Sequence, residues 1–448
     1  MKPIKLIHTL LAIVLVVGFS SCEDYFGDVN ENPNNPPTAS EASMLGQIEG
    51  RLVYAIGGDA TRYISVYTQH VDGISRQFAV YQDYGIQGVD VNNLWGFSLY
   101  AGVLNDIQIV KDLAVENGNN HFLGVAQILE AYTMLFITDN FNDAPYSDAW
   151  QGRDQLSPVY DTQDQIYTQV FSLLSEGRAN LERDAGLNAL ANDLIYSTSL
   201  PDNLDKWEKF SYLIEARAHL HRAKINSSAY SDALTAVQQS FESNADNAGF
   251  QFTNSPTTAA PWYQFNDQRG DIDVGANYVA LLSSLNDPRD SVYGRTLDTE
   301  HPLFQQEQFV LLASYAEAKF IEAECLFQTS GGAAAEAAYT EGITASFEFV
   351  DAQAGTAISD SLNFYLSQTG VDPAGNLTLE QIMTQKYIAM FTDPEVFNDW
   401  RRTNIPELTP NSGSQIPRRL PYPEQEINFN TNAPTGVTIF DRVDWDTE

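Results

Sequence analysis

The chain has 448 residues, and its 59 Asp and Glu against 24 Lys and Arg give a formal net charge of −35. Nucleic acids and anionic lipid surfaces repel a body this acidic, so the charge excludes both as direct partners of the folded part. Neutral ligands remain open, and the excess charge also fits a simple role in solubility.

The N-terminus has the three parts of a secretory signal peptide. Lys2 and Lys5 make a positive start, residues 10–19 form an apolar run too short to span a membrane, and two serines lead into Cys22. Small residues followed directly by a cysteine resemble the lipobox of bacterial lipoproteins, in which the cysteine carries the acyl chains of a membrane anchor. We therefore predict a signal peptide at residues 1–21 and lipidation of Cys22. The open alternative is a secreted protein with an incidental cysteine.

The next segment has the composition of a tether. Glu23 and Asp24 resemble the acidic surface-export signal of Bacteroidetes lipoproteins, and a plain solvated linker is the alternative. Residues 28–43 are rich in Asn, Pro and Ser and hold few large apolar groups, so they cannot bury a core. We expect residues 22–43 to form the acylated cysteine and a flexible tether. Residues 44–448 are then a single domain, of a size that helical arrays reach as one unit.

Beyond the tether, apolar residues recur at helical rather than strand spacing. In the first predicted helix, Phe97 and Val103 are expected on one apolar side, and Asp161 is expected to cap the third helix. Trp95 and Trp207 lie inside helical patterns and are expected in the core. The predicted helices cover residues 91–114, 121–141, 161–181, 205–225, 231–243, 311–328, 333–349 and 379–391.

Three pairs of these helices have the length of a helix–turn–helix repeat, about 35 residues. Alanines stand where paired helices must approach closely: Ala126 and Ala131 in one pair, and Ala316, Ala323 and Ala337 in another. The placement resembles tetratricopeptide repeats, so we predict an all-α fold, a tetratricopeptide-like scaffold of helical hairpins with long irregular loops. An irregular helical bundle is the alternative. Long ordered loops on a rigid scaffold tend to carry function.

Several sequence blocks that follow one another along the chain resemble the SusD/RagB family, and most closely its shorter SusD-like subgroup. The resemblance covers the whole chain, and it is the conjunction of blocks that is specific. Where the family often has glycine, this chain has Asn142, and asparagine also tolerates a left-handed backbone. The blocks are "TDNFNDAPYSDA" (138–149), "DKWEKFSYLIEARAHLHRA" (205–223), "SYAEAKFIEAECLF" (314–327), "TQKYIAMFTDPEVFNDWRRTNIP" (384–406) and "IPRRLPYPEQEINFN" (416–430).

The resemblance implies a nutrient-binding protein rather than an enzyme, without a cofactor. Such proteins sit on the outer face of the outer membrane and touch the membrane only through their lipid anchor. Each caps a SusC-type TonB-dependent transporter and passes it an oligosaccharide or, in some cases, a peptide. The fold implied is again a helical, tetratricopeptide-like scaffold with irregular loops.

Two other functions remain open. The first is a surface glycan hydrolase or lyase on an all-helical toroid. The chain has no G-x-S-x-G, H-E-x-x-H or G-x-x-x-x-G-K motif, and its many carboxylates make a two-carboxylate argument unspecific. His219 and His221 are two apart on a helix and so face different sides. The second is a purely structural surface repeat protein.

Asp267, Asp271 and Asp273 are oxygen-rich but lack EF-hand spacing, so no metal is expected.

The C-terminal blocks gather opposite charges around aromatic rings and prolines. Arginine forks pair with carboxylates and stack on rings, so we interpret the region as a structural clasp that pins the last loop to the helices. A site for an acidic nutrient is the alternative. Pro145 and Tyr146 are interpreted as a structural turn, with a cis bond possible between Ala144 and Pro145. The clasp residues are Trp400, Arg401, Arg402, Arg418, Arg419, Tyr422 and Glu426.

Two loop clusters combine aromatic rings with polar groups, as sugar sites do. The alternative is that these aromatics close the loops onto the scaffold or face the transporter. Cys325 lies on an apolar helix and is expected to be a buried thiol, with no internal disulfide. The ligand-binding candidates are Arg76, Tyr81, Gln82 and Tyr84 in the first cluster and Trp262, Tyr263 and Asn266 in the second.

Overall fold

The computed structural model describes residues 39–196 and 201–448. The predicted signal peptide, Cys22 and most of the predicted tether lie outside the described residues. The fold is all-α with long irregular connections, as predicted, and the described strands form only two-stranded sheets. Cys325 is a buried free thiol, as expected.

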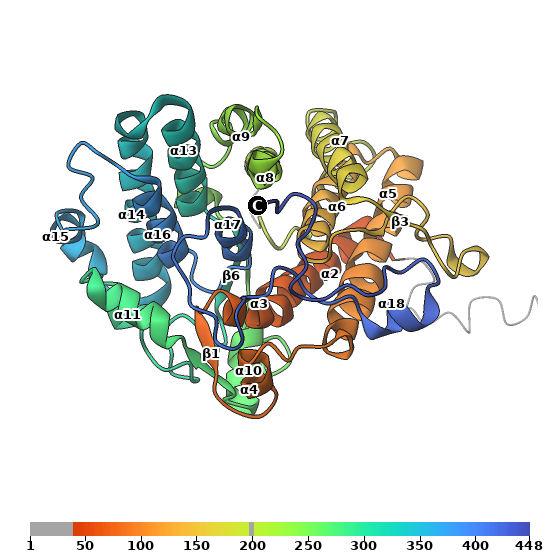
Figure 1. Cartoon of the computed structure of the whole chain (residues 1–448). Helices are drawn as coiled ribbons and strands as arrows, with labels where there is room; N and C mark the ends of the chain where they lie inside the picture. Colours follow the sequence, from red (N-terminus) through yellow and green to blue (C-terminus); the bar gives the residue numbers. More distant parts are fainter. Residues whose placement is uncertain (1–38, 197–200) are drawn as a thin grey trace, which may run out of the picture.

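The paired helices from α5 to α14 form an arch, and α17 lies beneath it (Figure 1). α6 packs on α7, α8 on α9 and α13 on α14, while contacts between α7 and α8 and between α9 and α13 join the pairs. The scaffold consists of α2 (Glu41–Tyr54), α5 (Asn105–Asn117), α6 (Asn120–Phe141), α7 (Gln163–Leu181), α8 (Asp202–His221), α9 (Ala229–Val237), α13 (Tyr315–Ser330), α14 (Gly332–Ala354), α16 (Leu379–Ala389) and α17 (Glu395–Thr403).

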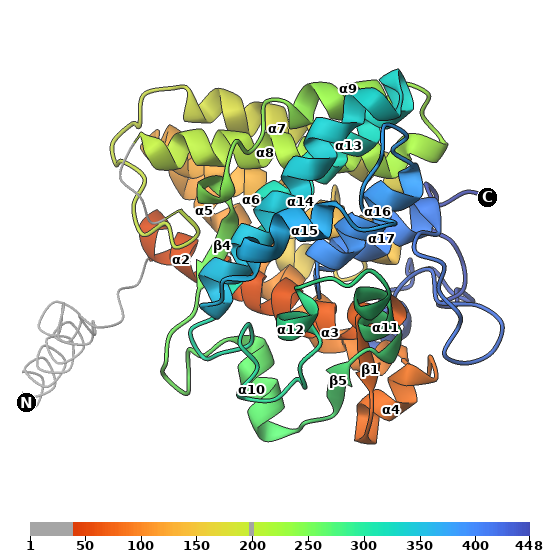
Figure 2. The ribbon, with the colours of Figure 1, turned by 90° about the vertical axis from the view of Figure 1, so that its left-hand side faces the viewer.

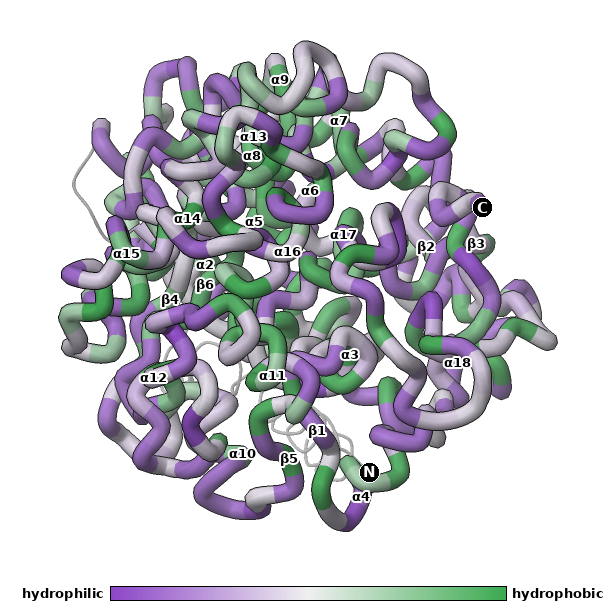
Figure 3. Tube along the Cα trace, turned by 60° about the vertical axis from the view of Figure 1, so that its left-hand side comes forward, coloured by the Kyte–Doolittle hydropathy of each residue, from purple (hydrophilic) through white to green (hydrophobic). Residues whose placement is uncertain are grey.

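The connections contain short elements, many of which gather at the end of the molecule opposite the arch (Figures 1 and 2). The chain around α10 and α12 is mostly hydrophilic (Figure 3). The short helices are α3 (Thr61–Tyr67), α4 (Arg76–Gln82), α10 (Pro261–Gln268), α11 (Ala276–Ser284), α12 (Asp290–Tyr293), α15 (Leu362–Leu366) and α18 (Glu424–Phe429). The strands are β1 (Val71–Gly73), β2 (Ala144–Pro145), β3 (Tyr160–Asp161), β4 (Ala248–Gln251), β5 (Ile272–Val274) and β6 (Phe309–Ala313). They pair antiparallel as β1–β5, β2–β3 and β4–β6.

Other short helical segments are not α-helical. Two are π-helices, η2 (Ala55–Ala60) and η4 (Asn93–Leu104). The rest are 3-10 turns: η3 (Gly88–Val91), η5 (Gly152–Asp154), η6 (Arg222–Lys224), η7 (Asn244–Asp246) and η8 (Ile358–Ser361).

The helix predicted at residues 91–114 is therefore present, but its first part is π-helical rather than α-helical. In a π-helix the hydrogen bonds join residue i to i+5, so side chains leave the α-helical register. Phe97 consequently points outward with 65% of its surface exposed, and its prediction as a buried residue is wrong. Val103 is buried, and Trp95 and Trp207 are in the core, as predicted.

Glycine, in addition to the predicted alanine, stands where paired helices approach each other closely. A Cβ atom on Gly124 of α6 would lie only 2.8 Å from the carbonyl oxygen of Gly177 on α7. Four of the five alanines predicted at such contacts are buried. Ala337 is exposed, so that prediction is wrong, because the face of α14 turned toward α13 instead carries Ala335 and Ala338.

α6 is the central helix. It is long and apolar enough to cross a membrane by composition, but 94% of its most apolar window is buried inside the fold, which identifies it as a core helix. The helices on either side cover it, and its C-terminal end leads into the turn at residues 142–146.

The turn after α6 and the start of α7 each differ in one detail from the expectations. Asn142 adopts φ 72° and ψ −121°, a backbone region that favours glycine, so the turn is kept with asparagine in place. Ala144–Pro145 is trans, and the cis bond of the described chain is Ile405–Pro406. Thr162, not Asp161, caps α7, through reciprocal hydrogen bonds with Gln165. Asp161 instead accepts hydrogen bonds from the backbone N–H groups of residues 146 and 147.

Candidate functional site

The two predicted ligand loops lie side by side. β1 and β5 pair with Val71 opposite Val274. Beyond the strands, Arg76 Nε donates to Asp271 Oδ1 over 2.6 Å. The ring of Phe78 from the first loop packs edge-on against Phe265 from the second, with 5.2 Å between centroids. The loops therefore form one unit, although the sequence separates them by about two hundred residues.

Three of the aromatic residues predicted to contact the ligand are buried, so the expectation that their rings are open for stacking is wrong. Tyr81, Tyr84 and Trp262 expose only 2%, 6% and 1% of their surface. Trp262 packs against Phe304, 5.0 Å between centroids, and the Tyr84 hydroxyl accepts a hydrogen bond from the backbone N–H of Asn411. Their burial closes the loops onto the scaffold, which was the alternative interpretation of these clusters.

The other four candidates reach the surface to different extents. The Arg76 side chain is 60% exposed but is paired with Asp271. Gln82 is half-buried and binds Asp72 and the backbone N–H of Gly73. Tyr263 is half-buried. Asn266 is 9% exposed, and neither polar atom of its amide has a hydrogen-bond partner within the described chain.

An open hollow of about 520 Å³ lies next to this unit, and we call it the aromatic groove. Two of its rings are open to solvent: Tyr54 at the end of α2 is 38% exposed, and Phe97 of η4 is 65% exposed. The groove is lined by Arg51, Tyr54, Asp59, Asn93, Phe97 and Ser98.

The π-helical geometry produces the groove. In η4, residues four or five positions apart share a face, which places Asn93, Phe97 and Ser98 together. Gly102 follows on the same face, and a Cβ atom there would overlap the guanidinium of Arg51. The absence of a side chain at residue 102 thus lets Arg51 lie across η4, 5.1 Å from the Phe97 centroid.

The groove is bordered by the second predicted loop. Asp59 pairs with Arg62, whose guanidinium lies 4.7 Å from the ring centroid of Phe265 on α10. The Tyr54 hydroxyl lies 3.5 Å from Gln264 Oε1 on the same helix. Burial raises the pKa of Tyr54, so its hydroxyl stays protonated and can donate a hydrogen bond at neutral pH.

A second hollow, of about 530 Å³, lies along the next face of η4. Tyr100 stacks on Trp150 with ring centroids 6.3 Å apart, and its hydroxyl donates to the carbonyl oxygen of Pro145. Tyr146 donates from its hydroxyl to Glu130, 3.0 Å away. Pro145 and Tyr146 therefore hold the turn after α6 against the wall of this hollow.

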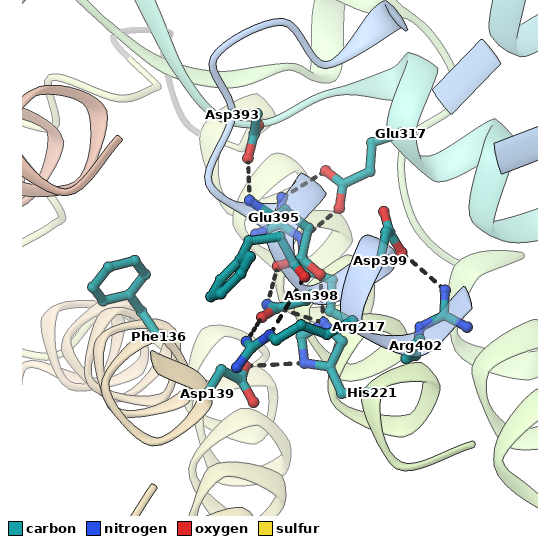
Figure 4. A network of polar contacts seen from close by, with 12 residues as sticks. Phe136, Asp139, Arg217, His221, Glu317, Asp393, Glu395, Asn398, Asp399 and Arg402 are labelled. Carbon is teal, nitrogen blue, oxygen red and sulfur yellow. Dashed lines mark hydrogen bonds and ion pairs between the residues drawn. The ribbon is translucent and has the colours of Figure 1, made fainter. Parts of the chain in front are cut away.

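The C-terminal motif brings its charges inside the protein. Arg402 on α17 donates two hydrogen bonds to the Glu324 carboxylate of α13, over 2.5 and 2.7 Å, and one to Asp399. Lys386 of α16 lies 2.7 Å from the other oxygen of Asp399. All four side chains are buried, so each charge depends on its partners. Figure 4 shows the contact between Asp399 and Arg402.

The neighbouring arginines hold the C-terminal segment that contains Trp445 and Asp446. The Arg401 guanidinium lies between the rings of Phe397 and Trp445, 4.2 and 4.7 Å from their centroids. Arg418 pairs with Asp446 and lies 4.9 Å from the centroid of Trp400.

The remaining motif residues tie this segment to the turn after α6. Arg419 lies over the Tyr422 ring and donates to the carbonyl oxygen of Phe141. The Tyr422 hydroxyl donates to the carbonyl oxygen of Asp143, and Glu426 accepts from the Tyr160 hydroxyl. The geometry is that of a clasp, because each group is used to join two distant parts of the chain.

A buried histidine completes the network. His221 at the end of α8 lies between Asp139, 2.9 Å away, and Glu395 of α17 (Figure 4). Burial lowers its pKa, but the carboxylates of Glu395 and Asp139 outweigh that effect and raise it to about 9. His219 faces another side, as expected, and stacks on Phe171. A histidine already charged and enclosed by carboxylates stabilises the fold and is a poor proton acceptor.

Sequence reasoning missed most of the aromatic groove. Tyr54 lies in an amphipathic helix, and Phe97 has the spacing of a core residue if the segment is α-helical. The available signal was glycine: Gly57, Gly58 and Gly102 interrupt helical patterns at the two π-helices. Among the described residues, no group of three or more His, Cys, Asp or Glu side chains is arranged to hold a metal ion.

Comparison with known proteins shows which solved structures are similar to this architecture. The chain is 24% identical to a SusD/RagB family protein of Bacteroides thetaiotaomicron, covering 91% of this chain and 99% of that one with a TM-score of 0.76. It is 21% identical to a SusD homologue of Bacteroides fragilis, covering 92% and 100% with a TM-score of 0.75. It is also 21% identical to a chitin-binding protein, covering 91% and 100% with a TM-score of 0.76.

These likenesses establish the fold. No curated protein sequence matches the chain. The model of one family, SusD-like_2, described as starch-binding and associating with the outer membrane, matches residues 33–302 and 298–423. The chain therefore belongs to this SusD-like family of outer-membrane-associated, nutrient-binding proteins.

Proposed function

We propose that the protein captures an oligosaccharide in the aromatic groove and delivers it to a SusC-type TonB-dependent transporter. The observation that carries the proposal is the pair of solvent-exposed rings, Tyr54 and Phe97, surrounded by Arg51, Asp59 and Asn93. Sugar rings present apolar faces to aromatic side chains and hydroxyl groups to amides, carboxylates and guanidinium groups.

The shape of the groove suits capture rather than catalysis. It is an open hollow, so a bound chain can leave it, which transfer to a second protein requires. Its carboxylate, Asp59, is paired with Arg62, and it lacks a second carboxylate opposite it among its lining residues. The similar chitin-binding protein supports a glycan as the ligand, and the predicted loop residues Arg76, Gln82, Tyr263 and Asn266 are proposed to extend the site.

The anchor belongs to the same proposal. We propose that residues 1–21 are removed and that Cys22 is acylated. The predicted tether of residues 22–43, of which residues 41–43 already form the first turn of α2, is proposed to link the domain of residues 44–448 to the exterior of the outer membrane. In whole cells, Cys22→Ser should release the protein from the membrane fraction. A Cys22→Ser protein that stays in that fraction would contradict lipid anchoring. Isolation of the wild type together with a large TonB-dependent barrel would support the partnership, and its isolation alone from gently solubilised membranes would oppose it.

The groove is tested by calorimetric titration of residues 39–448 with neutral, charged and N-acetylated oligosaccharides, with products checked by chromatography. Phe97→Ala and Tyr54→Ala should each weaken binding about tenfold, or about 1.4 kcal/mol. The matched control is Phe364→Ala, since Phe364 is 60% exposed and belongs to α15, which Figure 1 shows apart from α2. Full affinity in both groove variants would reject this site, and cleaved product would favour a hydrolase or lyase.

A further inference from the structure

A separate pocket lies beside the aromatic groove. Its volume is about 90 Å³, and we call it the Asp393 pocket. η2 separates the two sites: Tyr54 and Asp59 line the groove, while Gly57 lines the pocket. The other walls come from α10, α12, β6, the end of α14 and residues 389–394. α10, α12 and α14 are visible on one side of the molecule in Figure 2.

The pocket wall is aromatic. Trp262, Phe304, Phe391 and Tyr293 form a continuous chain of rings, with centroids 5.0, 6.0 and 5.1 Å apart in that order. Phe309 and Phe349 also line the pocket, and together with Phe391 they are only half-buried, so they keep accessible surface. Such ring faces carry negative charge density and attract cations.

Among the polar groups of the pocket, the one charged group is negative. Asp393 carries the pocket's only carboxyl group, and no Lys, Arg or His is among the lining residues. One Asp393 oxygen accepts a hydrogen bond from the backbone N–H of Glu395 over 2.8 Å, and the other receives none from the described chain. Gln308 Oε1 is buried and also lacks a donor within the described residues. The charge of Arg217 acts on Asp393, but within the described chain Arg217 donates its hydrogen bonds to Glu317 and to the carbonyl oxygen of Leu312 and none to Asp393.

The backbone that presents Asp393 is strained. Thr392 has φ 62°, a conformation that β-branched residues rarely adopt. It is held there by a hydrogen bond from its N–H to His70 Nδ1 and by one from the Thr61 hydroxyl to its carbonyl oxygen. Strain of this kind persists only where the surrounding structure fixes it, and it gathers at ligand sites.

We propose that the Asp393 pocket binds an alkylammonium group, with the cation between the aromatic rings and the Asp393 carboxylate. A neutral apolar ligand would leave both acceptors unsatisfied, and an anion would meet a carboxylate and ring faces of the same sign. The volume has room for about six water-sized groups, which fits an ammonium head with a short alkyl stem. The site is distinct from the aromatic groove and does not depend on the groove's function.

The ionisation of Asp393 supports this assignment. Burial raises its pKa to about 7, opposed by Arg217 and assisted by Glu317 and Glu395, the charged groups that face it from α8, α13 and α17. A bound cation favours the ionised carboxylate, so binding should tighten between pH 6 and pH 8. A neutral ligand would show no such dependence.

The test is calorimetric titration of residues 39–448 with n-butylammonium chloride. The neutral control is n-butanol, which has the same number of non-hydrogen atoms as n-butylammonium. We expect n-butylammonium to bind, n-butanol not to bind, and Asp393→Asn to weaken n-butylammonium binding at least tenfold. Equal binding of the alcohol, or undiminished binding to a folded Asp393→Asn protein, would overturn the proposal. If Asp393→Asn fails to fold, Phe349→Leu at the half-buried wall serves instead, with the same tenfold expectation and the same consequence if affinity is unchanged.

Competition then identifies the source of the ammonium group. Displacement of n-butylammonium by an oligomer of glucosamine, but not by its N-acetylated form, would assign the pocket to amino sugars. Displacement by a short peptide, but not by its N-acetylated form, would assign it to peptide amino termini. Displacement by neither leaves a free small amine as the ligand. Phe97→Ala removes a groove ring and should not alter n-butylammonium binding, which separates this proposal from that for the groove.

Discussion

The guanidinium of Arg51 lies 5.1 Å from the ring centroid of Phe97, so a cation from α2 covers one face of a ring that η4 holds out to solvent. The contact fixes both side chains in the open groove, where an unrestrained phenylalanine would rotate freely. A fixed ring loses little conformational entropy when a sugar stacks on it.

Gly102 permits this contact and offers a direct test of it. In Gly102→Ala the new methyl group would displace the Arg51 guanidinium, which is the mobile end of a flexible side chain. We expect oligosaccharide affinity to fall several-fold, while the free energy of unfolding changes by less than about 1 kcal/mol because helical Ala is preferred to Gly. Calorimetry and urea unfolding measure the two quantities. Unchanged affinity would show that Arg51 need not be held over Phe97.

The clasp should be sensitive to loss of one partner. Arg402→Met leaves Glu324 and Asp399 buried with fewer counter-charges, and we expect the free energy of unfolding to fall by about 3–5 kcal/mol. The double variant Arg402→Met with Glu324→Met removes the pair together and should lose clearly less. Urea denaturation of both variants makes the comparison. A single variant as stable as wild type would refute the view that the pair is interdependent.

His221 predicts a loss of stability at alkaline pH. Its folded pKa of about 9 lies above the unfolded value near 6.5, so its contribution is complete below pH 6.5 and disappears as pH rises through 9. The contribution is on the order of 3 kcal/mol. Urea midpoints measured from pH 7 to pH 9 should fall in the wild type and vary less in His221→Gln. Parallel curves for the two proteins would contradict this assignment.

The contact between α6 and α7 depends on two glycines. Gly124→Ala would place a methyl group against the Gly177 carbonyl and should destabilise the fold by about 1–3 kcal/mol. Gly50→Ala on α2 is the matched control, because its Cβ would lie 3.5 Å from the nearest atom, and it should be neutral or stabilising by up to about 1 kcal/mol. Thermal unfolding distinguishes them, and equal behaviour of the two variants would argue against a tight α6–α7 contact.

The scaffold could be predicted from sequence because its helices bury continuous apolar faces, as α6 and α7 do. The C-terminal charges could be grouped because opposite charges near aromatic rings need one another when buried. The groove could not be predicted, since Phe97 faces outward only when the segment is π-helical. Tyr81 and Trp262 have a composition typical of a binding loop, and whether such rings face inward depends on contacts with Tyr63 and Phe304 that the local sequence does not contain.

The hydrogen bond from Trp445 Nε1 to Asp139 Oδ1 joins residues 306 positions apart. During synthesis, α6 and α8 therefore emerge long before the segment that completes the surroundings of Asp139 and His221. Until Trp445 and Asp446 are in place, the two buried positions that they occupy in the folded protein stay open to water. Maturation of this protein is thus expected to finish in a late, concerted docking step, and chains cut short before residue 445 should be recognised by proteases as incomplete.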